Sequence, residues 1–120
     1  MLDIILEDLE FISDSIDLIN SRFSKINKPS EFVDSPDGVT LLDSITIRLQ
    51  SIGESVKNIE KRKEDFFSPY TEVDWQEIIK FRDFISHHYN EVDHEIIYII
   101  CKNHLPELKT TIEKIIKDFK

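Results

Sequence analysis

A chain of 120 residues with a net charge of −9 fits one acidic domain, and that charge argues against a broad nucleic-acid-binding surface, which would carry a basic excess. Apolar residues make up 40% of the chain, as in globular proteins, and two glycines are few for the tight turns of an all-β fold. The single cysteine, Cys101, excludes a disulfide within this chain and fits a reducing compartment.

The beginning of the chain predicts neither a signal peptide nor a membrane anchor. Acidic residues interrupt its apolar residues from Asp3 onward, and no basic segment precedes them. The longest apolar run, residues 96–101, is far shorter than the roughly 18 residues needed to span a bilayer. We therefore expect a cytoplasmic protein without membrane contact, which engages any nucleic acid at a local site or as part of a complex.

The first predicted helix spans residues 2–26. A second apolar stripe of Ile4, Phe11 and Leu18 lies on nearly the opposite side of this helix from its core face. The stripe predicts either a subunit interface or a helix that is buried on two sides within one bundle. The core face recurs at intervals of one, three or four residues and consists of Leu2, Ile5, Leu6, Leu9, Ile12, Ile16, Ile19, Phe23 and Ile26.

A second helix is predicted over residues 39–62, after a linker at residues 27–38 that holds two prolines and a glycine. Gly53 interrupts this helix at a cost of about 1 kcal/mol relative to alanine, which suggests a close approach by a neighbouring helix or room for another group. The core residues of the helix alternate three and four apart, as in helix bundles, and they are Leu42, Ile45, Leu49, Ile52, Val56 and Ile59.

Capping residues mark the starts of two further helices. Asp74 is typical of an N-cap in a capping-box pattern, and Asp93 is typical of the N-cap of a helix that continues to the end of the chain. Pro106 lacks a backbone donor, so we expect a kink or break near residues 103–104. The dense helical patterns and the absence of alternating strand patterns predict an all-α antiparallel bundle of four to five helices, in a single domain over residues 1–120.

The third helix carries the candidate chemistry in the order R-x-x-x-x-H-x-Y. Arg82 can bind a phosphate through two N–H groups, His87 can move protons near neutral pH, and Tyr89 offers a hydroxyl that can be modified. Together they suggest phosphodiester chemistry without a metal. No histidine–carboxylate–cysteine cluster has the spacing of a metal site, and no glycine-rich phosphate loop occurs, so we expect no cofactor.

The spacing within this motif bears on whether one helix can form the site. Tyr89 lies about 20° from Arg82 round the helix, with Ser86 between them on the same face. His87 lies about 140° from Arg82, so a straight helix does not aim both at one phosphate. Either the helix ends or distorts near His87 and His88, or two copies of the helix assemble the site across a two-fold axis.

Two carboxylates lie one helical turn from the motif histidine. Asp83 precedes His87 by four residues and Glu91 follows it by four, so either can hold the imidazole in one tautomer. A purely structural interpretation of the motif stays open, with a surface arginine, a partly buried histidine and a tyrosine at the edge of the core.

Several segments occur together in an order and spacing that is typical of one known family. From residue 52 onward they resemble the HepT-like branch of the HEPN family, whereas the first fifty residues match only in their helical pattern. The matching segments are residues 52–57 (IGESVK), residues 75–79 (WQEII), the motif Arg82…His87-x-Tyr89, residues 92–93 (VD) and residues 103–108 (NHLPEL).

This resemblance implies a helical bundle that forms a homodimer, with the two motif helices meeting in a cleft. It also implies the toxin of a type VII-like toxin–antitoxin system, acting as a metal-independent endoribonuclease. Arg82 would bind and polarise the scissile phosphate of an RNA substrate, and His87 would assist proton transfer as the 2′-hydroxyl attacks and a cyclic phosphate end forms. Asp83 would orient the site.

The resemblance further implies a modification site and secondary site residues. Tyr89 matches the tyrosine that the partner, a minimal nucleotidyltransferase antitoxin, modifies with AMP from ATP. The added bulk and negative charge would block RNA from the cleft. Glu54, Ser86 and His88 are possible secondary site residues.

The chain departs from the common family pattern after the tyrosine. Relatives often carry an aromatic residue and a glycine there, whereas this chain carries Asn90 and Glu91. Glu91 places a negative charge near the proposed phosphate site, and the chain as a whole has a net charge of −9. These features favour an alternative hypothesis, a non-catalytic HEPN module that binds a nucleotidyltransferase partner or a nucleotide.

Overall fold

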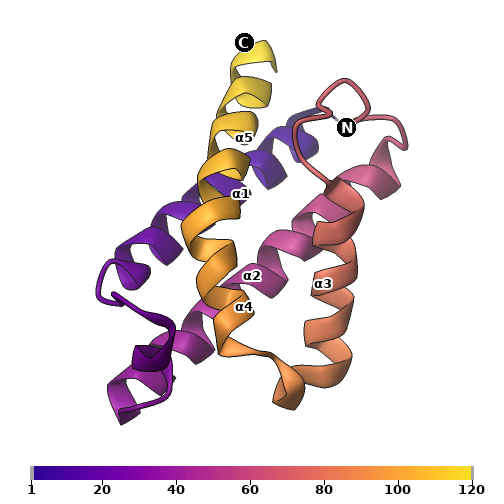
Figure 1. The fold of residues 1–120 in the computed structure, drawn as a ribbon. Coiled ribbons are helices and arrows are strands. Elements are labelled where there is room, and N and C mark those ends of the chain that lie inside the picture. Colours follow the sequence, from indigo (N-terminus) through magenta and orange to yellow (C-terminus); the bar gives the residue numbers. More distant parts are fainter. Residues whose placement is uncertain (1, 120) are drawn as a thin grey trace.

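Four helical columns make up the structure, a computed structural model that describes residues 2–119 (Figure 1). Residues 1 and 120, which the predicted domain includes, lie outside the described residues. The all-α prediction is confirmed, and no helix within residues 2–119 is long and apolar enough to cross a membrane. The columns are α1 (Leu2–Phe23), α2 (Pro36–Arg62), α3 (Trp75–His88) and the joined helices α4 (His94–Ile99) and α5 (Leu105–Phe119).

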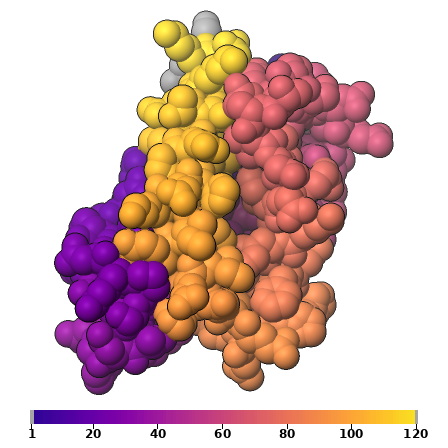
Figure 2. All heavy atoms as spheres, in the orientation of Figure 1, coloured from indigo at the N-terminus to yellow at the C-terminus, as the bar shows by residue number. Residues whose placement is uncertain are grey.

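The helix α2 is the central element of the bundle. It packs along α1 on one side and along α3 on the other, while α5 packs along α1. Successive columns run in opposite directions, so the bundle is antiparallel (Figure 1). The space-filling view shows α3 and the α4–α5 column on one face of the molecule (Figure 2). This arrangement brings the motif helix α3 against α2 along its length.

The predicted core face of the first helix is confirmed over most of its length. Both ends of the predicted face differ from the prediction. Leu2 is exposed, and α1 ends at Phe23, so Ile26 is buried but belongs to the turn after the helix. A turn of residues 24–27 and a short 3-10 helix, η1 (Pro29–Phe32), then carry the chain to α2. The fully buried residues of α1 are Ile5, Leu9, Ile12, Ile16 and Ile19.

The outer stripe of α1 faces solvent. Ile4, Phe11 and Leu18 have exposed fractions of 41%, 40% and 43%. The prediction of a helix buried on two sides within one chain is therefore wrong. The interpretation of the stripe as a subunit interface stays a prediction.

Side-chain caps set the starts of the later helices. The second helix begins at Pro36, three residues before the predicted start, because the Ser35 hydroxyl accepts a hydrogen bond from the backbone N–H of Gly38 at 3.0 Å. The predicted caps are confirmed: Asp74 accepts from the N–H of Glu77 at 3.1 Å, and Asp93 accepts from an N–H in the first turn of α4 at 2.8 Å.

The column formed by α4 and α5 is distorted where the sequence predicts a kink. A π-helical segment, η3 (Ile100–His104), joins the two helices and ends two residues before Pro106. Proline has no N–H to give to the preceding turn, and a wider turn accommodates this loss. The column continues through the segment without a break (Figure 1).

Candidate functional site

The motif helix meets α2 at a glycine. A Cβ atom added to Gly53 would overlap the Cβ of Arg82 and lie 2.9 Å from its Cγ. The stem of Arg82 therefore passes directly over the α2 backbone, and a side chain at position 53 would hold the two helices apart. This confirms the prediction that Gly53 permits a close approach by a neighbouring helix.

We expect Gly53→Ala to destabilise the protein although alanine is the better helix former. Overpacking costs about 1–3 kcal/mol, and the atoms that would have to move belong to the base of the Arg82 side chain. The gain in helix propensity is about 1 kcal/mol. The measurement is the free energy of unfolding in urea, with Ser51→Ala as a control on the same helix. A Gly53→Ala protein more stable than the wild type would contradict the close approach.

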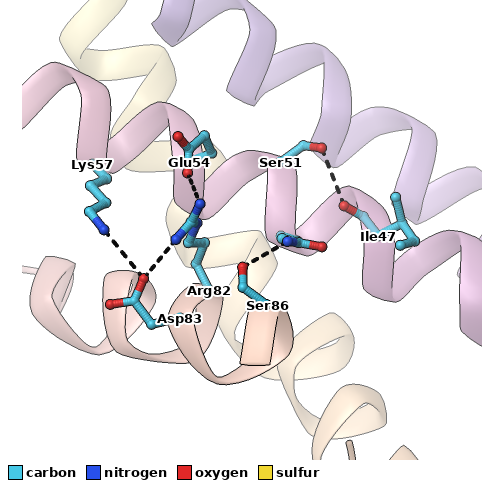
Figure 3. A network of polar contacts seen from close by, with 8 residues as sticks. Ile47, Ser51, Glu54, Lys57, Arg82, Asp83 and Ser86 are labelled. Atoms are coloured by element: carbon cyan, nitrogen blue, oxygen red, sulfur yellow. Dashed lines mark hydrogen bonds and ion pairs between the residues drawn. The ribbon is translucent and has the colours of Figure 1, made fainter. Parts of the chain in front are cut away.

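The guanidinium of Arg82 is held between two carboxylates (Figure 3). Its Nη2 pairs with Glu54 of α2, and its Nη1 donates to Asp83 Oδ1 at 2.9 Å. Lys57 Nζ reaches the same Asp83 oxygen at 3.5 Å. The hydrogen bond from Arg82, helped by Lys57, holds the pKa of Asp83 below its usual range. Two cations and two carboxylates thus form one network whose formal charges sum to zero.

Ser86 of α3, and Tyr89 in the 3-10 turn η2 (Tyr89–Glu91) that follows the helix, continue this line of contacts along α2. Ser86 accepts a hydrogen bond from Gln50 Nε2 at 2.8 Å, and the hydroxyl of Tyr89 donates to Asp43 Oδ1 at 2.9 Å. Partial burial, and then the hydrogen bond to Asp43, raise the pKa of the Tyr89 phenol. Arg82 and Ser86 on α3, and Tyr89 just after it, therefore all face α2, as their spacing predicts.

The two neighbouring histidines lie outside this network. The helix α3 extends through His88, so His87 belongs to the same helix as Arg82, and its side chain is exposed. Among residues 2–119, His87 makes no side-chain hydrogen bond or ion pair. The prediction that Asp83 or Glu91 holds His87 is wrong, because Asp83 is engaged by Arg82 and Glu91 pairs with His88 Nδ1 at 3.0 Å.

Three residues of α2 that contact the motif segment were not predicted from the sequence. Asp43, Gln50 and Lys57 are spaced by seven and place their side chains on one face of the helix. That spacing is a usable signal, although it does not say which residue of α3 each one meets. Within residues 2–119, no group of three or more histidine, cysteine or acidic side chains could hold a metal ion. The single thiol of the chain, Cys101, is buried, and burial raises its pKa to about 12.

A shallow groove connects the network to the outer stripe of α1. Its volume is about 480 Å³, and both Glu54 of the network and Phe11 of the stripe line it, together with Glu7, Asp8, Ser51 and Ser55. Glu54, the partner carboxylate of Arg82, and Phe11 of the stripe therefore border one groove.

Comparison with known proteins gives related sequences. A family profile described as "Ribonuclease HepT-like" matches residues 12–115. A candidate RNase of Methanocaldococcus jannaschii is 43% identical over 58% of this chain and 55% of its own length. A second candidate RNase of that organism is 32% identical over 92% of this chain and 82% of its own length. A Thermococcus cleftensis protein named "Probable ribonuclease HepT" is 30% identical over 91% of this chain and 93% of its own length.

The extent of these matches differs among the relatives. The chain spans about half the length of the first relative and 46% of the length of another M. jannaschii protein, whose name adds a gamma-glutamylcyclotransferase. No solved structure matches the chain significantly.

Proposed function

Because the chain belongs to the HepT-like ribonuclease family, we propose that it is a metal-independent endoribonuclease, acting as the toxin of a type VII-like HEPN and minimal-nucleotidyltransferase toxin–antitoxin system. One observation carries the proposal. Arg82 is fixed between Glu54 and Asp83 where α3 packs against α2 at Gly53, inside the segment that matches the family profile. An arginine fixed in this way can stabilise a phosphate without reorganising.

Arg82 would bind the scissile phosphate with N–H groups that do not contact Glu54 or Asp83. Of its five N–H donors, one on Nη1 and one on Nη2 face the carboxylates, and each of these nitrogens carries a second N–H. Glu54 and Asp83 act as positioning residues that set the plane of the guanidinium. The phosphate gains negative charge on its oxygens as the 2′-oxygen attacks, and a preorganised cation opposite those oxygens lowers the barrier.

The proposed reaction needs a proton acceptor and a proton donor. The RNA 2′-oxygen forms a bond to phosphorus and loses its proton, while the bond to the 5′-oxygen breaks and that oxygen gains a proton. The products are a 2′,3′-cyclic phosphate and a 5′-hydroxyl. His87 would serve this proton transfer, for which an imidazole suits neutral pH.

A homodimer would bring the two groups together. Arg82 faces α2 of its own chain, whereas His87 is exposed and lies about 140° away on the same helix. We propose that Arg82 of one protomer works with His87 of its partner in a cleft across a two-fold axis. The exposed stripe of Ile4, Phe11 and Leu18 supports this proposal, because Phe11 borders the same groove as Glu54.

Tyr89 is the proposed site at which a cognate nucleotidyltransferase neutralises the toxin. The tyrosine oxygen would bond to the α-phosphorus of ATP, and pyrophosphate would leave. The side chain is 39% exposed, so an enzyme can reach it, and Asp43 lies in place to accept the phenol proton. The attached AMP would add bulk and negative charge beside Arg82 and so exclude RNA.

The test uses purified protein, a labelled RNA and EDTA. We expect the wild type to cut the RNA and leave cyclic phosphate ends, and we expect His87→Ala to be slower by about 10²–10⁴-fold. Intact mass must first show that Tyr89 is unmodified, because an AMP group would mask the activity. Equal cleavage by both proteins would remove His87 from the proposal, and no cleavage by the unmodified wild type would overturn the nuclease function.

One observation favours the alternative function, a non-catalytic module that binds a nucleotidyltransferase or a nucleotide. The charges around Arg82 already balance, so the network by itself does not attract RNA. The two functions differ in the effect of Arg82→Lys. A nuclease would lose its activity, whereas a binding module would keep its partner.

A further inference from the structure

A second groove lies between α1 and α2, next to Tyr89. Its volume is about 420 Å³, within the range of small-ligand pockets. Asp43 lines it, and the same carboxylate accepts the hydrogen bond from the Tyr89 hydroxyl at 2.9 Å. The Tyr89 hydroxyl therefore contacts a residue that lines the groove. Its lining residues are Arg22, Thr40, Asp43, Ser44, Ile47 and Arg48.

Two of the chain's four arginines open into this groove. Arg22 and Arg48 are half-buried, and neither forms a side-chain hydrogen bond or an ion pair within residues 2–119. Arg48 lies over the ring of Phe11, with 5.8 Å between its Cζ atom and the ring centroid. In a chain of net charge −9, arginines without a carboxylate partner are unexpected. Their N–H groups are free for an anionic ligand.

The groove is suited to a phosphate ester. A guanidinium presents paired N–H donors that match phosphate oxygens. The hydroxyls of Thr40 and Ser44 also line the groove, but each donates its hydrogen to a backbone carbonyl of α2, so the arginines are the donors for a ligand. Ile47, which is 52% exposed, offers an apolar wall for a ribose or a base. The one acidic residue of the lining, Asp43, is engaged by Tyr89.

We propose that this groove binds a phosphate group of a nucleotide chain through Arg22 and Arg48. The inference rests on the proposed function, because it supplies the positive charge that the balanced network around Arg82 lacks. Two sources carry the same chemistry. One is a phosphate of the RNA strand that flanks the scissile position, and the other is the phosphate of a nucleotidyl group attached to Tyr89.

The test measures the binding of two probes to the full chain. The probes are a 2′-O-methyl oligonucleotide, which cannot be cleaved, and free AMP. We expect the double variant Arg22→Gln, Arg48→Gln to bind the oligonucleotide about tenfold more weakly for each arginine. The slope of log affinity against log salt should fall by about 0.7 for each lost phosphate contact on a single strand. The control Arg62→Gln removes one arginine charge at the C-terminal end of α2, outside the groove, and should bind as the wild type does.

Each outcome decides the inference. Loss of oligonucleotide binding assigns the groove to the RNA strand, and loss of AMP binding alone assigns it to the nucleotidyl group. The inference is overturned if the double variant binds both probes as Arg62→Gln does, or if neither probe binds the wild type. Because the oligonucleotide is not cut, a protein without nuclease activity can still show the expected loss of binding in the double variant. If the protein cleaves RNA but the double variant binds both probes normally, the groove proposal is wrong and the nuclease proposal stands.

Discussion

Arg82→Lys is expected to reduce RNA cleavage by about 10²–10³-fold, the loss that follows removal of one transition-state donor, while the protein stays folded. Lysine keeps a positive charge near Glu54 and Asp83, so the two carboxylates are not left without a cation. It loses the planar fork that can serve these carboxylates and a phosphate at the same time. The measurement is the single-turnover cleavage rate of a labelled RNA at saturating protein.

Arg82→Ala is a less informative change at this position. It would remove the cation that Glu54 and Asp83 share, leaving Asp83 with Lys57, and it would empty the space over Gly53. A loss of activity would then be confounded with a loss of stability. A suitable charge control is Lys80→Gln on the same helix, because Lys80 is 73% exposed and its one ion pair within residues 2–119 is with Glu77. If Arg82→Lys cleaved RNA as fast as Lys80→Gln, Arg82 would not act on the phosphate.

The helices could be predicted because each depends on residues that are close in sequence. The core spacing of α1 and α2, and the caps Asp74 and Asp93, act within a few residues of the chain. The start of α2 was also available from the sequence. Ser35 followed by Pro36 is a helix-start signal, and the proline led to a linker prediction instead.

The partners within the site could not be predicted in the same way. Whether Arg82 meets Glu54, and Tyr89 meets Asp43, depends on the register between α2 and α3, which the periodicity of either helix leaves open. Gly53 indicated a close approach without naming the residue that makes it. Glu54 entered the prediction only through the family resemblance.

The histidine prediction failed for a local reason. Spacing by four made Glu91 a suitable partner for His87 on a continuous helix. The helix ends at His88 and a 3-10 turn, η2 (Tyr89–Glu91), follows it. In that turn the carboxylate comes round to His88 instead, three residues before it. His87 is left exposed on the side of α3 away from Arg82, which makes its proposed role dependent on a second chain.

Mixed dimers are expected to show that each site takes Arg82 from one protomer and His87 from the other. A dimer of one Arg82→Lys chain and one His87→Ala chain, isolated through two different tags, has one site with both residues intact and one with neither. We expect it to cleave RNA at about half the rate of the wild-type dimer, although each parent variant is nearly inactive. A mixed dimer as inactive as its parents would contradict a site shared between chains.

The matched control reverses the expected pattern. A dimer of one wild-type chain and one chain that carries both substitutions holds the same total of intact residues. If each site is shared between protomers, one site lacks Arg82 and the other lacks His87, so this dimer should be nearly inactive. If each site lies within one chain, the wild-type chain keeps a whole site and about half of the activity remains. A shared site therefore makes only the first mixed dimer active, whereas a site within one chain makes only the control dimer active. The comparison decides whether the exposed His87 and the buried stem of Arg82 act across the dimer.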